Sequence, residues 1–149
     1  MPIRAVSHVA VGVTDMDRAL RFYRDALGLS VSLDATEDFE GVGEIPAARR
    51  RGVYLRWRDG GDESFIVLDQ HDRDTSPVPR RFYELGIHHY GFWVTDVDAI
   101  VARAKALGED VMVEPVETDS LAYGEPPGRM IRSALLRDPD GNIVQLDQR

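Results

Sequence analysis

Residues 87–96 read IHHYGFWVTD, and residues 7–15 near the N-terminus read SHVAVGVTD. When these two stretches are aligned, His89 falls over His8 and the closing Val-Thr-Asp segments coincide, all at an offset of 81 residues. The alternation of apolar with small or polar residues in the N-terminal stretch predicts a β-strand, and residues 87–96 are predicted to form its counterpart in the other half. One histidine at the same strand position in each half predicts a site built where two similar half-domains face each other.

The ends of the two halves agree as well. Residues 65–70 read FIVLDQ and residues 143–148 read IVQLDQ, at an offset of 78 residues. Agreement at both ends, in the same order, indicates a duplication in which each half forms a strand, a helix and three further strands. We therefore predict an α+β fold of two tandem βαβββ modules. The first module covers residues 1–70, a linker covers 71–86, and the second module covers 87–149.

A helix is predicted after the first strand of each half. Asp15 and Asp96 can accept hydrogen bonds from the unpaired amides of a first helical turn. Apolar residues at helical spacing follow, and a glycine closes each stripe as helix C-termini favour. Residues 37–49, acidic at first and then basic, are interpreted as a loop over one end of the sheet, and residues 117–129, rich in glycine and proline, as a second loop.

The composition excludes several classes of protein. Apolar residues make up 43% and charged residues 30% of the 149 residues, as in soluble globular proteins. No window approaches the roughly 18 apolar residues of a membrane span, and the N-terminus lacks a secretory pattern, so we expect a cytoplasmic protein. The absence of cysteine excludes disulfides and thiolate ligands. A net charge of −8 disfavours nucleic acid as a partner, but leaves room for a small anionic molecule held by local arginines.

Three segments carry a family resemblance: residues 8–28 (HVAVGVTDMDRALRFYRDALG), the pair His88-His89, and residues 138–146 (DPDGNIVQL). Together with the duplication they resemble the vicinal oxygen chelate superfamily. That superfamily includes glyoxalase I, methylmalonyl-CoA epimerase, extradiol dioxygenases, fosfomycin-resistance enzymes and bleomycin-binding proteins. The resemblance covers nearly the whole chain, and its motifs are specific for the superfamily but not for one activity. It implies a cupped mixed β-sheet with helices on its outer face, a small-molecule substrate or ligand, and a homodimer.

In metal-using members of the superfamily, the ligands come from the first and last strands of each module. Carried over by position, they are His8, Val67, His89 and Gln145. The two histidines match the pattern, whereas Val67 cannot bind a metal. Gln145 replaces the usual glutamate, and its neutral amide binds a divalent ion more weakly and cannot act as a general base. Two imidazoles and one amide oxygen suit a labile Fe²⁺, Mn²⁺, Co²⁺, Ni²⁺ or Zn²⁺ ion.

Strand parity places these four positions on the sheet face turned away from the helices, where a pocket would form. The residues that could line that pocket are Val67, Trp93, Tyr54, Tyr123 and Arg132. Glu40, Glu44 and Glu125 lie in the two loops, and each could act as the general base that Gln145 cannot be. His88 is expected to face the helices or the strand edge. Asp69 and Asp147 share the parity of the site but are expected to be solvated near its end.

These observations leave two functions open. The first is a divalent-metal-dependent enzyme of the superfamily, a glyoxalase- or epimerase-like lyase or isomerase acting on a small oxygenated substrate. The second is a metal-free protein that binds or sequesters a small molecule, as bleomycin-resistance proteins do. His8 and His89 favour the enzyme, whereas Val67 and Gln145 favour the binding protein. An extradiol dioxygenase is disfavoured, because that chemistry holds iron with two histidines and one carboxylate.

Overall fold

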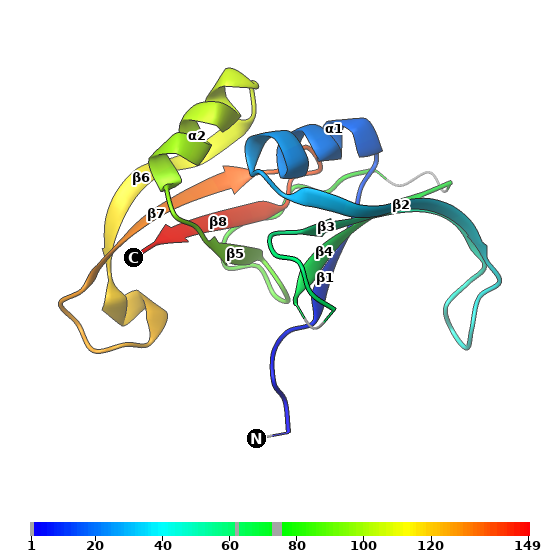
Figure 1. Cartoon of the computed structure of the whole chain (residues 1–149), viewed down its shortest axis with the longest axis horizontal. Helices are drawn as coiled ribbons and strands as arrows, with labels where there is room; N and C mark the ends of the chain where they lie inside the picture. Colours follow the sequence, from blue (N-terminus) through cyan, green and yellow to red (C-terminus); the bar gives the residue numbers. More distant parts are fainter. Residues whose placement is uncertain (1, 62, 73–75) are drawn as a thin grey trace. The chain divides into compact units, whose positions relative to one another are not determined.

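The computed structural model describes residues 2–61, 63–72 and 76–149 (Figure 1). The chain folds as two compact units, Met1–Pro77 and Val78–Arg149, which we call the first and the second unit. Each unit contains one four-stranded mixed sheet. The element order confirms the predicted α+β fold of two tandem βαβββ modules.

The sheet of the first unit has the strand order β1-β4-β3-β2, with β1 parallel to β4 and the other pairs antiparallel. Its helix begins as an α-helix and continues in wider, π-helical turns. The elements are β1 (His8–Gly12), α1 (Met16–Leu20), η1 (Arg21–Ala26), β2 (Ser30–Phe39), β3 (Ala48–Arg56) and β4 (Phe65–His71).

The sheet of the second unit repeats this topology in the order β5-β8-β7-β6, again with only the first pair parallel. A short 3-10 helix, η2, follows β6 and lies in the connection to β7 (Figure 1). The elements are β5 (His89–Trp93), α2 (Val97–Ala106), β6 (Asp110–Asp119), η2 (Ser120–Tyr123), β7 (Met130–Arg137) and β8 (Ile143–Gln148). No helix among the described residues is long and apolar enough to cross a membrane.

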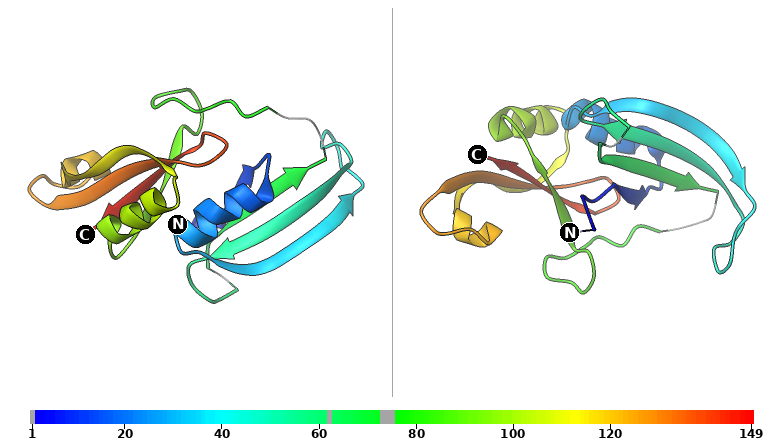
Figure 2. Two further views of the ribbon diagram at one scale, coloured as in Figure 1. Left: turned by 90° about the horizontal axis from the view of Figure 1, so that it is seen from above. Right: turned by 60° about the horizontal axis from the view of Figure 1, so that its bottom comes forward.

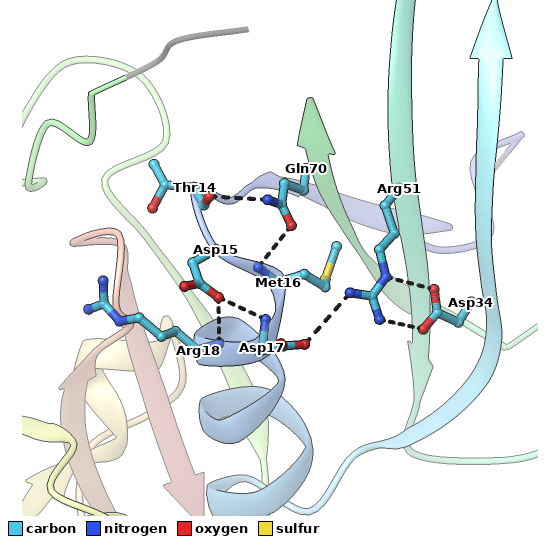
Figure 3. A network of polar contacts seen from close by, with 8 residues as sticks. All are labelled: Thr14, Asp15, Met16, Asp17, Arg18, Asp34, Arg51 and Gln70. Carbon is cyan, nitrogen blue, oxygen red and sulfur yellow. Dashed lines mark hydrogen bonds and ion pairs between the residues drawn. The ribbon is translucent and has the colours of Figure 1, made fainter. Parts of the chain in front are cut away.

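Polar contacts at the start of α1 tie the helix to the last strand of its own unit (Figure 3). The Asp15 carboxylate accepts hydrogen bonds from the backbone amides of Asp17 and Arg18, at 3.0 and 3.1 Å. Oε1 of Gln70, at the end of β4, accepts the amide of Met16 at 3.0 Å. Side chains thus satisfy three amides that a helix start leaves without intrahelical partners, which confirms Asp15 as the predicted N-cap.

The start of α2 has the same construction. Asp96 accepts the amide of Ala99 at 2.9 Å, as the predicted N-cap of this helix. Oε1 of Gln148, at the end of β8, accepts the amide of Val97 at 2.8 Å. Gln148 stands 78 residues after its counterpart in the first unit, the offset found in the sequence. The duplication therefore extends from strand order to individual hydrogen bonds.

Each unit buries the sheet face that carries its helix (Figures 1 and 2). On the last strands, Ile66 and Leu68 of β4 and Val144 and Leu146 of β8 are almost fully buried. The helices contribute the fully or nearly fully buried side chains of Met16, Ala19, Phe22, Tyr23, Ala26, Val97, Val101 and Ala104. The opposite face of each sheet carries His8 and Val67 in the first unit and His89 and Gln145 in the second.

The interpretation of residues 37–49 as a loop is wrong at both ends. Strand β2 continues to Phe39 and β3 begins at Ala48, so that only residues 40–47 connect them. The acidic run and the basic run are partners on adjacent strands, as in the Arg49–Asp38 ion pair at 3.1 Å. Opposite charges directly across an antiparallel pair stabilise it, so these charged runs favour strands.

Candidate functional site

On the helix-free face of the first unit, His8 lies beside an aromatic cluster. Its ring stacks on that of Phe65, its register partner on β4, with centroids 5.1 Å apart and planes 13° apart. The Tyr54 ring lies 5.8 Å from Phe65, and the Arg56 guanidinium covers Phe65 at 4.7 Å. Val67, the next residue of β4 on this face, is buried and pairs with Tyr54. This face is aromatic and apolar around one imidazole.

The Nδ1 atom of His8 lies 2.9 Å from the Ser7 hydroxyl oxygen, within hydrogen-bond distance. This contact leaves Nε2 as the ring nitrogen available to a ligand. Metal-binding histidines usually have their second ring nitrogen hydrogen-bonded in this way, because the bond fixes the tautomer and the ring orientation.

On the equivalent face of the second unit, His89 is surrounded by aromatic rings. Its Nδ1 atom lies 2.7 Å from Nδ1 of His88, and the ring of Phe82 stacks on it with centroids 4.8 Å apart. Burial, followed by the neighbouring imidazole of His88, lowers the pKa of His89, while the carboxylate of Asp147 opposes the shift. His89 therefore favours the neutral form, the form that binds a metal.

Phe82 reaches His89 from the segment that precedes β5. The amide of Arg80 in this segment donates to the Gly141 carbonyl at 3.0 Å, and a guanidinium nitrogen of Arg137 donates to the Arg80 carbonyl at 2.8 Å. The segment is thus fastened to the Asp138–Gly141 turn of its own unit. Because Phe82 lies within the predicted linker, sequence reasoning gave it no role.

A polar network surrounds Gln145 on β8. Its Nε2 atom donates to Asp147 Oδ1 at 2.9 Å and to the Tyr123 hydroxyl at 3.2 Å. The Tyr123 hydroxyl in turn donates to the same Asp147 oxygen at 2.6 Å. Burial, and then the hydrogen bond to Asp147, raise the pKa of Tyr123, which keeps the phenol protonated. Gln145, Asp147 and Tyr123 form one hydrogen-bonded cluster.

The strand register places this cluster near His89. Gly91 pairs with Gln145 and Trp93 with Asp147, while His89 pairs with the residue two before Gln145. A Cβ atom on Gly91 would lie 3.3 Å from Asp147 Oδ2, so that the carboxylate occupies space that a side chain would need. Trp93 packs beside Tyr123, with ring centroids 5.7 Å apart.

The prediction that Asp147 is a solvated carboxylate is wrong, since only 6% of the residue is exposed. Its parity on β8 was predicted, but its burial depends on Tyr123, which is distant in the sequence. Arg132 lies on the opposite face of β7 and forms an ion pair with Asp98 of α2 at 2.5 Å. Because its guanidinium is bound to Asp98 on the helix side, the structure does not support the prediction that Arg132 lines the pocket.

The three glutamates proposed as bases gain no support from the structure. Glu40 and Glu44 are exposed in the β2–β3 connection. Glu125 forms an ion pair with Arg149, which lowers the pKa of its carboxyl group. A carboxyl group held in its charged form by an arginine is a weak proton acceptor.

A hollow of about 500 Å³ opens on the first unit, lined by Phe39, Ile45, Pro46, Ala48, Arg50 and His71. The register of β3 and β4 puts Arg50 and His71 on the same face as Tyr54 and Val67. Arg50 is neutralised by ion pairs with Glu37 and Asp69, each at 2.6 Å. The hollow is therefore mainly apolar, and its one guanidinium is already held by two carboxylates.

The fit of a metal ion can be judged from the donor atoms of each unit. The first unit offers the Nε2 atom of His8, and the second offers that of His89 and the amide oxygen of Gln145. Within the part of the chain that the structure describes, no three histidine, aspartate or glutamate side chains gather as a metal cluster. The donor types nevertheless fit a divalent transition metal, since imidazole nitrogens and a neutral oxygen are common ligands for such ions.

Comparisons with known proteins agree with this fold. The family model of the Glyoxalase/Bleomycin resistance protein/Dioxygenase superfamily matches residues 5–146. The chain is 28% identical over 146 residues to a probable chloroplastic lactoylglutathione lyase of Arabidopsis thaliana. That alignment covers 98% of this chain but only 36% of the plant protein, so the chain spans well under half of that relative.

Two solved structures show the same fold. A glyoxalase family protein from Bacillus cereus has a TM-score of 0.72 at 18% identity, covering 99% of this chain and 95% of its own. A glyoxalase I mutant from Zea mays has a TM-score of 0.71 at 19% identity, covering 97% of this chain and 44% of its own. At these identities the likeness concerns the fold alone.

Proposed function

This chain belongs to the Glyoxalase/Bleomycin resistance protein/Dioxygenase superfamily, and from that premise we propose that it is a divalent-metal-dependent lyase or isomerase. His8, His89 and Gln145 are its protein ligands. The observation that carries the proposal is the equivalent position of the two histidines, each with Nδ1 in a hydrogen bond. The glyoxalase-type relatives support a lyase or isomerase, whereas the amide at position 145 argues against extradiol cleavage.

When bound, the ion would supply Lewis acidity to a substrate with neighbouring oxygen atoms. The residues of the chain would bind the ion and orient the substrate. An imidazole binds a metal in its neutral form and the amide of Gln145 is neutral, so no ligand side chain would cancel the charge of the ion. Such a ligand set favours a substrate that carries negative charge on its oxygens. We therefore expect a small, anionic or readily ionised oxygen compound as the substrate.

The first experiment measures metal content by elemental mass spectrometry, on protein purified without a histidine tag. We expect near-stoichiometric uptake of Mn²⁺, Ni²⁺, Fe²⁺ or Zn²⁺, and its loss in the His8→Ala/His89→Ala double variant. His71→Ala is the matched control and should keep full uptake, because this exposed histidine lies outside the ligand set. A wild-type protein that takes up none of the four ions would exclude the metalloenzyme.

The hollow of the first unit favours a second candidate, a metal-free binding protein. Its volume lies within the range of small-molecule pockets, and four of its six lining residues are apolar. An uncharged, apolar molecule would be the ligand of such a protein. If metal uptake fails, apolar compounds that raise the melting temperature should do so in wild type and lose the effect in Ala48→Trp, which fills the hollow.

A further inference from the structure

We propose that Asp147 and Tyr123 are positioning residues that hold the Gln145 amide with its oxygen turned toward the ligand. This role rests on the proposed function, because it gives the Gln145 oxygen a metal to bind. Neither residue would be a ligand of the ion. The two side chains act through the amide, and their effect is to fix which of its two polar atoms is available.

The direction of each hydrogen bond follows from the chemistry of its partners. An ionised carboxylate can only accept hydrogen bonds, so the amide atom 2.9 Å from Asp147 Oδ1 must be the nitrogen. The Tyr123 hydroxyl donates its proton to Asp147 at 2.6 Å and can accept the second amide hydrogen at 3.2 Å. Both amide hydrogens are then used, and Oε1 is the polar atom left to a ligand.

The partners of Gln145 are themselves held in place. Asp147 is buried, and its carbonyl accepts the backbone amide of Val94 at 2.8 Å, which fixes the end of β8. Tyr123 ends η2, whose first turn is capped by Asp119 through the amide of Leu121 at 2.8 Å. The hydroxyl and the carboxylate are thus preorganised by groups outside the cluster, as a positioning role requires.

The first unit shows that the arrangement is not a general feature of the fold. Val67 stands where the second unit has Gln145, and Asp69 stands where it has Asp147. Asp69 accepts a hydrogen bond from Arg50 at 2.6 Å, a purely structural pairing within its sheet. Among the residues that the structure describes, only those of the second unit combine an amide with a carboxylate and a phenol at these positions. The carboxylate at position 147 is therefore bonded to a side-chain amide only in the unit that has a glutamine at position 145.

The buried Asp147 carboxylate would also affect a glutamate placed at position 145. In this chain a glutamate there would meet the buried Asp147 carboxylate, and two like charges at hydrogen-bond distance repel. Gln145→Glu alone should therefore destabilise the protein and gain little metal affinity. Adding Asp147→Asn removes the repulsion, and this double variant should bind metal more tightly than wild type.

The test uses the full chain and two measurements. The side-chain amide signals of Gln145 are followed by NMR without metal, and Mn²⁺ affinity is measured by calorimetry. We expect Asp147→Leu, which keeps the side-chain size but removes both accepting oxygens, to weaken Mn²⁺ binding by about tenfold to a hundredfold, as for other groups that orient metal ligands. Tyr123→Phe keeps the ring against Trp93 and should weaken binding less. Both variants should shift the Gln145 amide signals in the metal-free protein.

Tyr90→Phe is the matched control, because it removes a phenol hydroxyl from β5 of the same unit, on a residue whose register partner, Val144, lies on the buried face that carries the helix. It should leave both measurements unchanged. Folded Asp147→Leu and Tyr123→Phe proteins whose Gln145 amide signals match those of wild type would overturn the positioning role. Failure of wild type to bind Mn²⁺ or the other ions, with the amide signals shifting as expected, would instead overturn the proposed function.

Discussion

The two units share a scaffold but differ in the chemistry of their helix-free faces. Around His8 the first unit gathers the rings of Phe65 and Tyr54 and the buried Val67. Near His89 the second unit has the hydrogen-bonded amide of Gln145 and the buried carboxylate of Asp147. Their helix caps and strand registers nevertheless correspond closely. The backbone thus constrains the position of a residue on the face and leaves its chemistry open to change.

The helix-free faces of the two units suit different kinds of contact with a ligand. An aromatic, apolar surface binds the uncharged part of a small molecule, because burial of apolar area is favourable and undirected. A hydrogen-bonded amide instead presents one atom in one direction. Substitutions can test the comparison between the units. They are made in the equivalent cores, at the equivalent helix caps and around the histidine of the second unit.

The largest effect is expected in the cores. Leu68 and Leu146 occupy equivalent positions on the last strands and are 0% and 1% exposed. Leu68→Ala and Leu146→Ala should each lower the free energy of unfolding by about 3 kcal/mol, from lost burial and the cavity left behind. Urea unfolding measures both losses. A loss below about 1 kcal/mol in only one unit would contradict equivalent cores.

A smaller effect is expected at the helix caps. Asp15→Ala and Asp96→Ala should each cost about 1 kcal/mol of stability. Asp15 should cost more, because it accepts two backbone amides whereas Asp96 accepts one. Asn substitutions keep an accepting oxygen and serve as controls that retain most of the stability. A larger loss for Asp96→Ala than for Asp15→Ala would contradict the hydrogen-bond pattern.

The smallest effect concerns the titration of His89 in the metal-free protein. Its pKa should lie below the ordinary 6.5, because burial disfavours the imidazolium. The unfolded chain then binds this proton more readily, so His89 makes stability fall as the pH drops from about 6.5 toward its lowered pKa. NMR titration of the ring protons measures the shift.

Two variants separate the causes of that shift. Phe82→Ala exposes the His89 ring and should return its pKa toward the ordinary value. Asp147→Asn removes the charge that favours the imidazolium and should lower the pKa further. A wild-type pKa at or above 6.5, a lower pKa in Phe82→Ala or a higher pKa in Asp147→Asn would contradict the assigned causes.

The sequence was sufficient to predict the fold, because the modules are marked by local signals. Each of these signals can be recognised from a few neighbouring residues. They are the two strand motifs, the capping aspartates and the glutamines that end the last strands. The charges of residues 37–49 were misinterpreted because their partners lie across the hairpin. Parity predicted the face of Asp147, but not its burial under Tyr123, and Phe82 reaches His89 only through a tertiary anchor at Gly141.

The wide turns of η1 accompany a difference in helix length between the two units. The first unit has one residue more than the second between its capping aspartate and the glycine that ends its helix. The amide of Leu27 reaches back five residues to the Phe22 carbonyl at 3.0 Å, which takes up the excess. Gly28 and Gly108 still end both helices with φ of 87° and 78°. One copy has therefore gained or lost a residue since the duplication, and the helix absorbed it while the strand order that follows stayed the same.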